Sequence, residues 1–207
     1  SWKLTGNGTP NSAQFNTVNS QLLGGTLDGK GRVDWSKENW SGTLKADNLN
    51  LTELNKNLPK NTHIYIDTDG HIKNNSPLKY EANAHIYNKD NDIKLKINKK
   101  AQINITWNTH LKNLRALYRN LSGNIESAGK MSYGTKITST GNLTSKNLSY
   151  KKASTRNIES SWEVKNNTFT QAILNISDLQ YNTTEIKNFE ANIKGDEKKH
   201  RANITFK

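Results

Sequence analysis

Apolar and polar residues alternate with a period of two along most of the chain. In the run from Leu27 to Val33, for example, apolar residues and glycines alternate with charged ones. Similar runs recur at residues 78–86, 93–97, 101–107, 158–164 and 202–206. Because successive side chains of a strand point to opposite faces, the pattern predicts strands with one apolar and one polar face. The short spacing between runs predicts antiparallel hairpins, since parallel neighbours need long crossovers.

One stretch departs from this period. Its leucines and Tyr118 follow helical spacing, which predicts one short helix near residues 110–121 with Asn108 or Thr109 as its N-cap. A second candidate, at residues 51–55, predicts a single helical turn. Asp67-Thr68-Asp69-Gly70 begins like a calcium-binding loop but lacks the rest of that pattern, so it predicts a turn.

The chain contains two related copies of one pattern. Residues 25–35 align without gaps on residues 123–133, and residues 41–49 align on residues 140–148 after one inserted residue. Such self-similarity is typical of proteins that add strands along an axis. We therefore expect residues 1–207 to form a single elongated segment with two related copies, at about residues 13–60 and 111–160.

Two details of these copies bear on the shape of the sheet. The apolar parity slips by one residue between Ala46 and Leu49 and again at residues 145–148, which predicts a β-bulge at each place. Gly29, Gly31 and Gly129 lie on the apolar parity, where missing side chains predict a tightly bent sheet; ordinary weakening of a strand near an edge is the alternative. The expected fold class is all-β: an elongated, strongly curved, mostly antiparallel sheet.

Composition supports a sheet with only one dry face. The apolar fraction is 32%, which is low for a globular protein and by composition alone leaves disorder open. The alternation favours a sheet, because a sheet with one wetted face needs apolar residues at only half its positions. The net charge of +12 comes largely from lysines scattered along the polar parity. That distribution predicts a solvated face rather than a nucleic-acid surface, and it leaves attraction to anionic lipids open.

Sequence motifs for catalysis are absent. There is no cysteine, no helical pairing of the five histidines, no phosphate-binding glycine loop and no nucleophile elbow. A metal site built on His63 and His71, which flank a predicted turn, is not favoured. The five tryptophans could be stacking platforms, but three lie on the apolar parity, where buried aromatic residues are the better interpretation. We predict a protein that is not an enzyme and has no catalytic residues, metal or cofactor.

The order and spacing of several segments resemble the TamB family. These segments are Leu23-Gly24-Gly25-Thr26-Leu27 to Trp35 with Leu49-Asn50-Leu51 and Leu54, then Leu111 to Leu148, then Ile186 to Ala202. The resemblance implies a fragment of the periplasmic region of a larger protein, anchored in the inner membrane of a Gram-negative bacterium. It further implies a sheet folded lengthwise into a trough (a β-taco) that carries phospholipids between the two membranes, paired with the outer-membrane barrel protein TamA. A link to outer-membrane protein assembly, with nascent outer-membrane proteins as further partners, is also implied.

On this resemblance, the apolar parity is expected to line the trough and bind acyl chains, while Lys30, Arg32, Lys94 and Lys96 point outward. The expected lining is Leu27, Val33, Trp35, Leu44, Ile64, Ile66, Leu78, Tyr80, Ile86, Ile93, Leu95, Ile97, Ile103, Ile105, Trp107, Ile125, Met131, Leu143, Ile158 and Trp162. Two other functions stay open. A scaffold or chaperone would pair with outer-membrane β-strands through a sheet edge, and a surface adhesin would expose aromatic residues on the polar parity.

Overall fold

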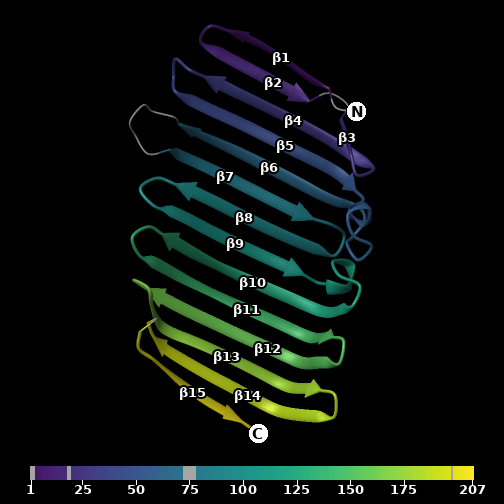
Figure 1. The fold of residues 1–207 in the computed structure, drawn as a ribbon, viewed down its shortest axis with the longest axis vertical. Helices are drawn as coiled ribbons and strands as arrows, with labels where there is room; N and C mark the ends of the chain where they lie inside the picture. Colours follow the sequence, from purple (N-terminus) through teal and green to yellow (C-terminus); the bar gives the residue numbers. More distant parts are fainter. Residues whose placement is uncertain (1–2, 18–19, 72–77, 197) are drawn as a thin grey trace. The chain divides into compact units, whose positions relative to one another are not determined.

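The computed structural model describes residues 3–17, 20–71, 78–196 and 198–207. The chain divides into two compact units, Ser1–Ile105 and Thr106–Lys207. The described residues form 15 strands and two short 3₁₀ helices (Figure 1). The all-β prediction is therefore confirmed.

The strands of the first unit follow chain order in the sheet. Hydrogen-bonded neighbours run β1-β2-β4-β5-β6-β7-β8, and β3 also pairs with β4. All of these pairings are antiparallel. The elements are β1 (Leu4–Thr9), β2 (Ser12–Thr17), β3 (Ser20–Leu22), β4 (Gly25–Asp34), β5 (Asn39–Leu49), the 3₁₀ helix η1 (Leu51–Glu53), β6 (Thr62–His71), β7 (Lys79–Tyr87) and β8 (Asn91–Lys99).

The second unit repeats this plan with longer strands. Strand β9 (Ile103–Leu111) contains the boundary between the units, and from β10 to β15 each strand pairs antiparallel with the next. The remaining elements are the 3₁₀ helix η2 (Leu114–Ala116), β10 (Leu121–Tyr133), β11 (Ile137–Tyr150), β12 (Ala153–Lys165), β13 (Thr168–Tyr181), β14 (Thr184–Gly195) and β15 (His200–Phe206).

The buried core is small. In the first unit Leu27, Ala46 and Leu49 form a cluster beside η1, with Leu22 and Ile64 packed against it. In the second unit Leu114 of η2 is buried at 2% exposure. Among the described residues no helix is longer than three residues, so no helical layer covers either face of the strands.

Both predicted β-bulges are confirmed. From Ala46 to Leu49, β5 advances three residues while β6 advances two. Between Lys146 and Ser149, β11 likewise advances three residues against two of β10. The extra residue is an asparagine with a left-handed backbone in both copies, Asn48 at φ 56° and Asn147 at φ 52°. Asparagine tolerates this conformation better than other residues with a Cβ.

This conformation makes Asn147 a test of the bulge. Asn147→Val should lower the free energy of unfolding by about 1–2 kcal/mol, because a β-branched residue is strained at positive φ. Asn147→Gly should leave stability within a few tenths of a kcal/mol or raise it. Urea denaturation of the two variants measures the difference, and equal stabilities would contradict the bulge geometry.

The predicted helix at 110–121 is wrong. Strand β9 continues to Leu111, η2 spans only Leu114–Ala116, and β10 begins at Leu121. A three-turn helix is marginal without tertiary support, and here the adjacent strands extend into both of its ends. Of the leucines in this stretch, Leu114 lies in the single turn of η2 and is buried. The single helical turn predicted at residues 51–55 is confirmed as η1.

Two further expectations need correction. Asp67-Thr68-Asp69-Gly70 is not a turn but lies inside β6, where each residue pairs with β7. The sheet in neither unit is closed or strongly curled. The glycines on the apolar parity therefore do not bend the sheet tightly; several of them make room for aromatic rings, as described below.

Candidate functional site

The strand register of the first unit places the apolar residues on one face. Residues directly opposite each other in an antiparallel pair share a face, and the apolar residues oppose one another from β4 through β8. We call the face that they form the first apolar face. Its rows across β4–β8 are Leu27–Ala46–Ile64–Ile86–Ile93, Gly29–Leu44–Ile66–Ala84–Leu95, Gly31–Gly42–Thr68–Ala82–Ile97 and Val33–Trp40–Gly70–Tyr80–Lys99.

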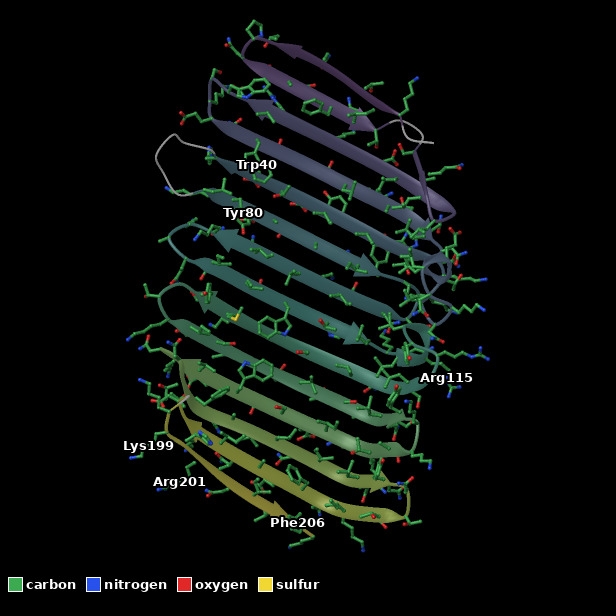
Figure 2. The ribbon with its side chains drawn as sticks, in the orientation of Figure 1. Trp40, Tyr80, Arg115, Lys199, Arg201 and Phe206 are labelled. Atoms are coloured by element: carbon green, nitrogen blue, oxygen red, sulfur yellow. The ribbon has the colours of Figure 1, made fainter. Side chains whose placement is uncertain are left out.

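Trp40 and Tyr80 lie near the same ends of their strands, one on each side of β6 (Figure 2). Between them is Gly70, whose missing side chain leaves space that the Trp40 indole occupies. The Trp40 ring thus covers the Gly70 backbone and occupies the space that a larger side chain would have filled.

The opposite face of the first unit is charged and locally neutralised. Lys96 pairs with Glu81 at 2.5 Å, and Lys45 pairs with Asp47 at 2.6 Å. Lys94 lies 3.7 Å from Asp92. Such exposed pairs contribute little to stability, but they show that the polar face carries cations and anions side by side.

A histidine–tyrosine stack lies on this polar face. The Tyr87 ring stacks on His63 at 4.8 Å and on His85 at 4.5 Å between ring centroids. Each histidine binds a carboxylate: His63 Nδ1 lies 2.8 Å from Asp47 and His85 Nε2 lies 2.6 Å from Asp92. A hydrogen bond from Lys45, which has the largest effect, and another from His63 hold the pKa of Asp47 below its ordinary value of 3.8.

This lowered pKa makes stability depend on pH. The folded state favours the ionised Asp47, so its contribution is full above pH 3.8 and is lost as the pH falls through the folded-state pKa. Asp47→Asn should therefore be less stable than the unchanged protein at neutral pH, and the gap should shrink at pH about 2. Urea unfolding at both pH values measures this. A gap of equal size at acid pH would mean that Asp47 acts through packing alone.

The second unit has a matching second apolar face. Its rows run from β10 to β15, with each residue opposite the next. The rows are Ile125–Ser145–Ile158–Ile176–Phe189–Phe206, Ser127–Leu143–Ser160–Leu174–Ala191–Ile204 and Gly129–Gly141–Trp162–Ala172–Ile193–Ala202. Met131 and Val164 continue the face toward the other ends of their strands.

Two tryptophans lie flat on this second face. The rings of Trp107 and Trp162 are nearly parallel, with centroids 6.1 Å apart. Their indole N–H groups donate to the hydroxyl oxygens of Ser127 and Ser139, each at 3.1 Å. With both polar atoms satisfied, the pair presents apolar ring surface.

Glycines make this arrangement possible. The Trp107 ring lies where a side chain on Gly129 would stand, and the Trp162 ring lies where one on Gly141 would stand. The equivalent pair in the first copy, Gly31 opposite Gly42, is not covered by tryptophan. The register is thus shared by the two copies, whereas the aromatic covering differs.

The structure places most of the predicted lining residues on these two faces. On the first apolar face lie Leu27, Val33, Leu44, Ile64, Ile66, Tyr80, Ile86, Ile93, Leu95 and Ile97, and on the second lie Trp107, Ile125, Met131, Leu143, Ile158 and Trp162. Ile103 and Ile105 share the parity of Trp107 in β9. The four cations expected to point outward, Lys30, Arg32, Lys94 and Lys96, lie on the polar face.

Three predicted lining residues differ from the rest. Trp35 lies in the turn after β4 at 56% exposure, and Leu78 precedes β7 at 48% exposure, so neither belongs to a strand row. Leu27 is on the correct face but only 4% exposed, so it offers a ligand little surface. Its role in the structure is to support the small core.

The expected lining omitted several residues of the two faces. Phe15 of β2 opposes Gly31, and Leu174, Ile176, Phe189 and Ile204 extend the second face. Residues 172–176 do alternate, but Ile173 on the opposite face masks the period.

The apolar rows are only partly shielded from solvent. Leu44 and Ile86 retain 36% and 38% of their surface, and Ile193 retains 38%. An uncovered apolar surface that spans several strands marks a site for another apolar molecule or protein. The described residues hold no cluster of three or more metal-ligating side chains. No helix in the described part of the chain has the length and hydropathy of a membrane span.

A comparison with models of protein families gives a match over the chain. The family model described as "TamB, N-terminal domain" matches residues 1–83 and residues 81–207. No curated protein and no solved structure matches the chain.

Proposed function

Because this chain belongs to the TamB family, we propose that it is a segment of a periplasmic bridge that carries phospholipids between the inner and outer membranes. The acyl chains travel on the two apolar faces, and the polar faces meet water. In this proposal the chain is one elongated segment of a larger protein anchored in the inner membrane of a Gram-negative bacterium. TamA is its outer-membrane partner, and no enzymatic step is needed.

The observation that carries the proposal is the continuity of the apolar rows. In the first unit, Leu44, Ile66 and Leu95 lie in one row, with only a glycine and an alanine as the other members. Exposing an acyl chain to water costs about 0.8 kcal/mol per CH₂, so a carrier needs a surface without polar gaps. Within the described strands, the rows that begin at Leu27 and Gly29 in the first unit and at Gly129 in the second contain no polar side chain across five and six strands.

The aromatic residues favour this function over an adhesin. A glycan-binding adhesin would need exposed aromatic rings on the polar face. There Tyr65 is exposed at 40%, but Trp40, Trp107 and Trp162 all lie on the apolar faces. A scaffold that pairs with outer-membrane β-strands is the alternative function. It would bind peptide rather than lipid, so the molecule that co-purifies with the chain distinguishes the two functions.

Mass spectrometry of the purified chain tests the proposal. The 207-residue chain, purified from a Gram-negative host without detergent, should carry phospholipid. A matched variant with Ile158→Asp, on the second apolar face, should carry several-fold less when both proteins fold equally by circular dichroism. Co-purified peptides without lipid would overturn the proposal in favour of the scaffold.

A further inference from the structure

The first half of the second unit has an unusual charge balance. Residues 106–152 contain eight lysines and arginines against a single acidic residue, Glu126. Glu126 lies opposite Thr144 on the polar face, in the middle of its strand. The positive charge toward the strand ends is therefore not balanced by acidic residues in the same segment.

Four of these cations gather at one end of β10 and β11. The ring centroids of Tyr118, after η2, and Tyr150, at the end of β11, are 6.3 Å apart, and the Lys151 ammonium lies 5.1 Å from the Tyr150 ring centroid. Arg115, Arg119, Lys151 and Lys152 all lie within three residues of this ring contact. We call these four residues the basic rim. Figure 2 shows Arg115 at these strand ends, and Lys199 at the opposite strand ends of the same unit.

The basic rim is exposed and has no acidic partner. All four side chains are exposed, and in the part of the chain that the structure describes none lies within 4 Å of a carboxylate. Some cations elsewhere in the described strands are paired: Lys96 binds Glu81, and Arg156 on the neighbouring strand β12 binds Asp178 at 2.9 Å. Uncompensated cations attract anions more strongly than paired ones.

The basic rim adjoins the second apolar face. Tyr150 opposes Leu121, and the row that contains Ile125 and Ile158 begins a few residues further along the same strands. Tyr150 and, at the next hairpin, Tyr181 are exposed at 40% and 61%. Cations and tyrosines bordering an apolar surface match the boundary between lipid headgroups and acyl chains.

Building on the proposed function, we propose that the basic rim binds the phosphate groups of anionic phospholipids whose acyl chains lie on the second apolar face. The rim thus determines at which ends of the strands the headgroups lie. A single-stranded nucleic acid fits less well, because its bases need open aromatic faces. Tyr150, at the centre of the rim, already contacts Lys151 and Tyr118.

Vesicle binding by charge-neutralised variants tests the rim. The first variant carries Arg115→Gln, Arg119→Gln, Lys151→Gln and Lys152→Gln. The matched control carries Lys130→Gln, Lys136→Gln, Lys194→Gln and Lys199→Gln, which removes the same charge near the opposite strand ends of the same unit. Co-sedimentation is compared between vesicles of pure phosphatidylcholine and vesicles that also contain phosphatidylglycerol, at low ionic strength.

The rim variant should lose at least tenfold in affinity for the anionic vesicles, while the control keeps most of it. A tenfold loss corresponds to about 1.4 kcal/mol, and four rim cations at roughly 1 kcal/mol each near an anionic surface exceed that. Equal losses of affinity in both variants would show an effect of net charge alone and would contradict specific binding at the basic rim. Undiminished binding by the rim variant, or displacement of the vesicles from the unchanged chain by a short RNA, would overturn it as well.

A second readout separates the rim from the proposed function. A photo-crosslinking residue at Ile158 should still capture acyl chains in the rim variant, since the apolar face is unchanged. If Ile158 in the unchanged chain captures lipids without preferring anionic ones, headgroup binding by the basic rim is refuted, but the proposed lipid carriage is not. No capture from Ile158 in any variant would refute lipid carriage itself.

Discussion

Alanine at Gly129 or Gly141 should destabilise the protein, whereas alanine at Gly31 or Gly42 should not. A methyl group at Gly129 or Gly141 would stand where the rings of Trp107 and Trp162 lie, and overpacking of this kind costs about 1–3 kcal/mol. A methyl group at Gly31 would remain 3.8 Å from the Phe15 ring, and one at Gly42 would remain 3.5 Å from the nearest atom, the Lys30 carbonyl oxygen. Because glycine weakens a strand, these two replacements should be neutral or stabilising by up to about 1 kcal/mol.

Urea denaturation of the four single variants, with tryptophan fluorescence as the probe, measures the contrast. The two pairs occupy equivalent positions in the two copies, so each pair serves as the control for the other. Similar effects at all four positions would contradict the packing explanation.

An aspartate on the apolar face should weaken lipid binding, whereas an aspartate on the polar face should not. Ile66 lies between Leu44 and Ala84 in the middle of the first apolar face, and its neighbour Tyr65 lies on the polar face opposite Lys45. Ile66→Asp places an unpaired charge in the path of an acyl chain, while Tyr65→Asp places it beside a cation in water. We expect a loss of about tenfold in affinity for a fluorescent phospholipid from Ile66→Asp.

Folding must be compared first, because a charge on the apolar face can also weaken the sheet. Circular dichroism and urea denaturation of both variants provide that check. With folding matched, equal lipid affinities for Ile66→Asp and Tyr65→Asp would show that lipids do not bind the first apolar face.

The alternation of residues was sufficient to predict most of the fold. Strand formation, the bulges at Asn48 and Asn147 and the shared face of Leu44, Ile66 and Leu95 all follow from a period of two and its two slips. These features are local, or they follow from pairing each strand with its neighbour in the chain. Antiparallel neighbours with short connections leave few alternative registers that bury the same side.

The failures come from contacts that the sequence does not reveal. The leucines near Leu114 follow helical spacing, but the adjacent strands extend into both ends of that stretch and leave room for one turn. Gly129 and Gly141 carry no sign of the indoles that cover them, because Trp107 and Trp162 come from other strands. The basic rim was missed for the same reason. Its cations are spread over residues 115–152, and the contact between Tyr118 and Tyr150 brings them together.

Photo-crosslinking in cells tests the central claim most directly. Leu95 lies on the first apolar face, and the adjacent Lys94 and Lys96 lie on the polar face. A photo-crosslinking residue at Leu95 of the full-length protein should capture phospholipid, detected by mass spectrometry of the purified adduct, and the same residue at Lys94 or Lys96 should not. Capture of lipid with equal yield at all three positions, or of peptide without lipid at Leu95, would contradict transport along an apolar face.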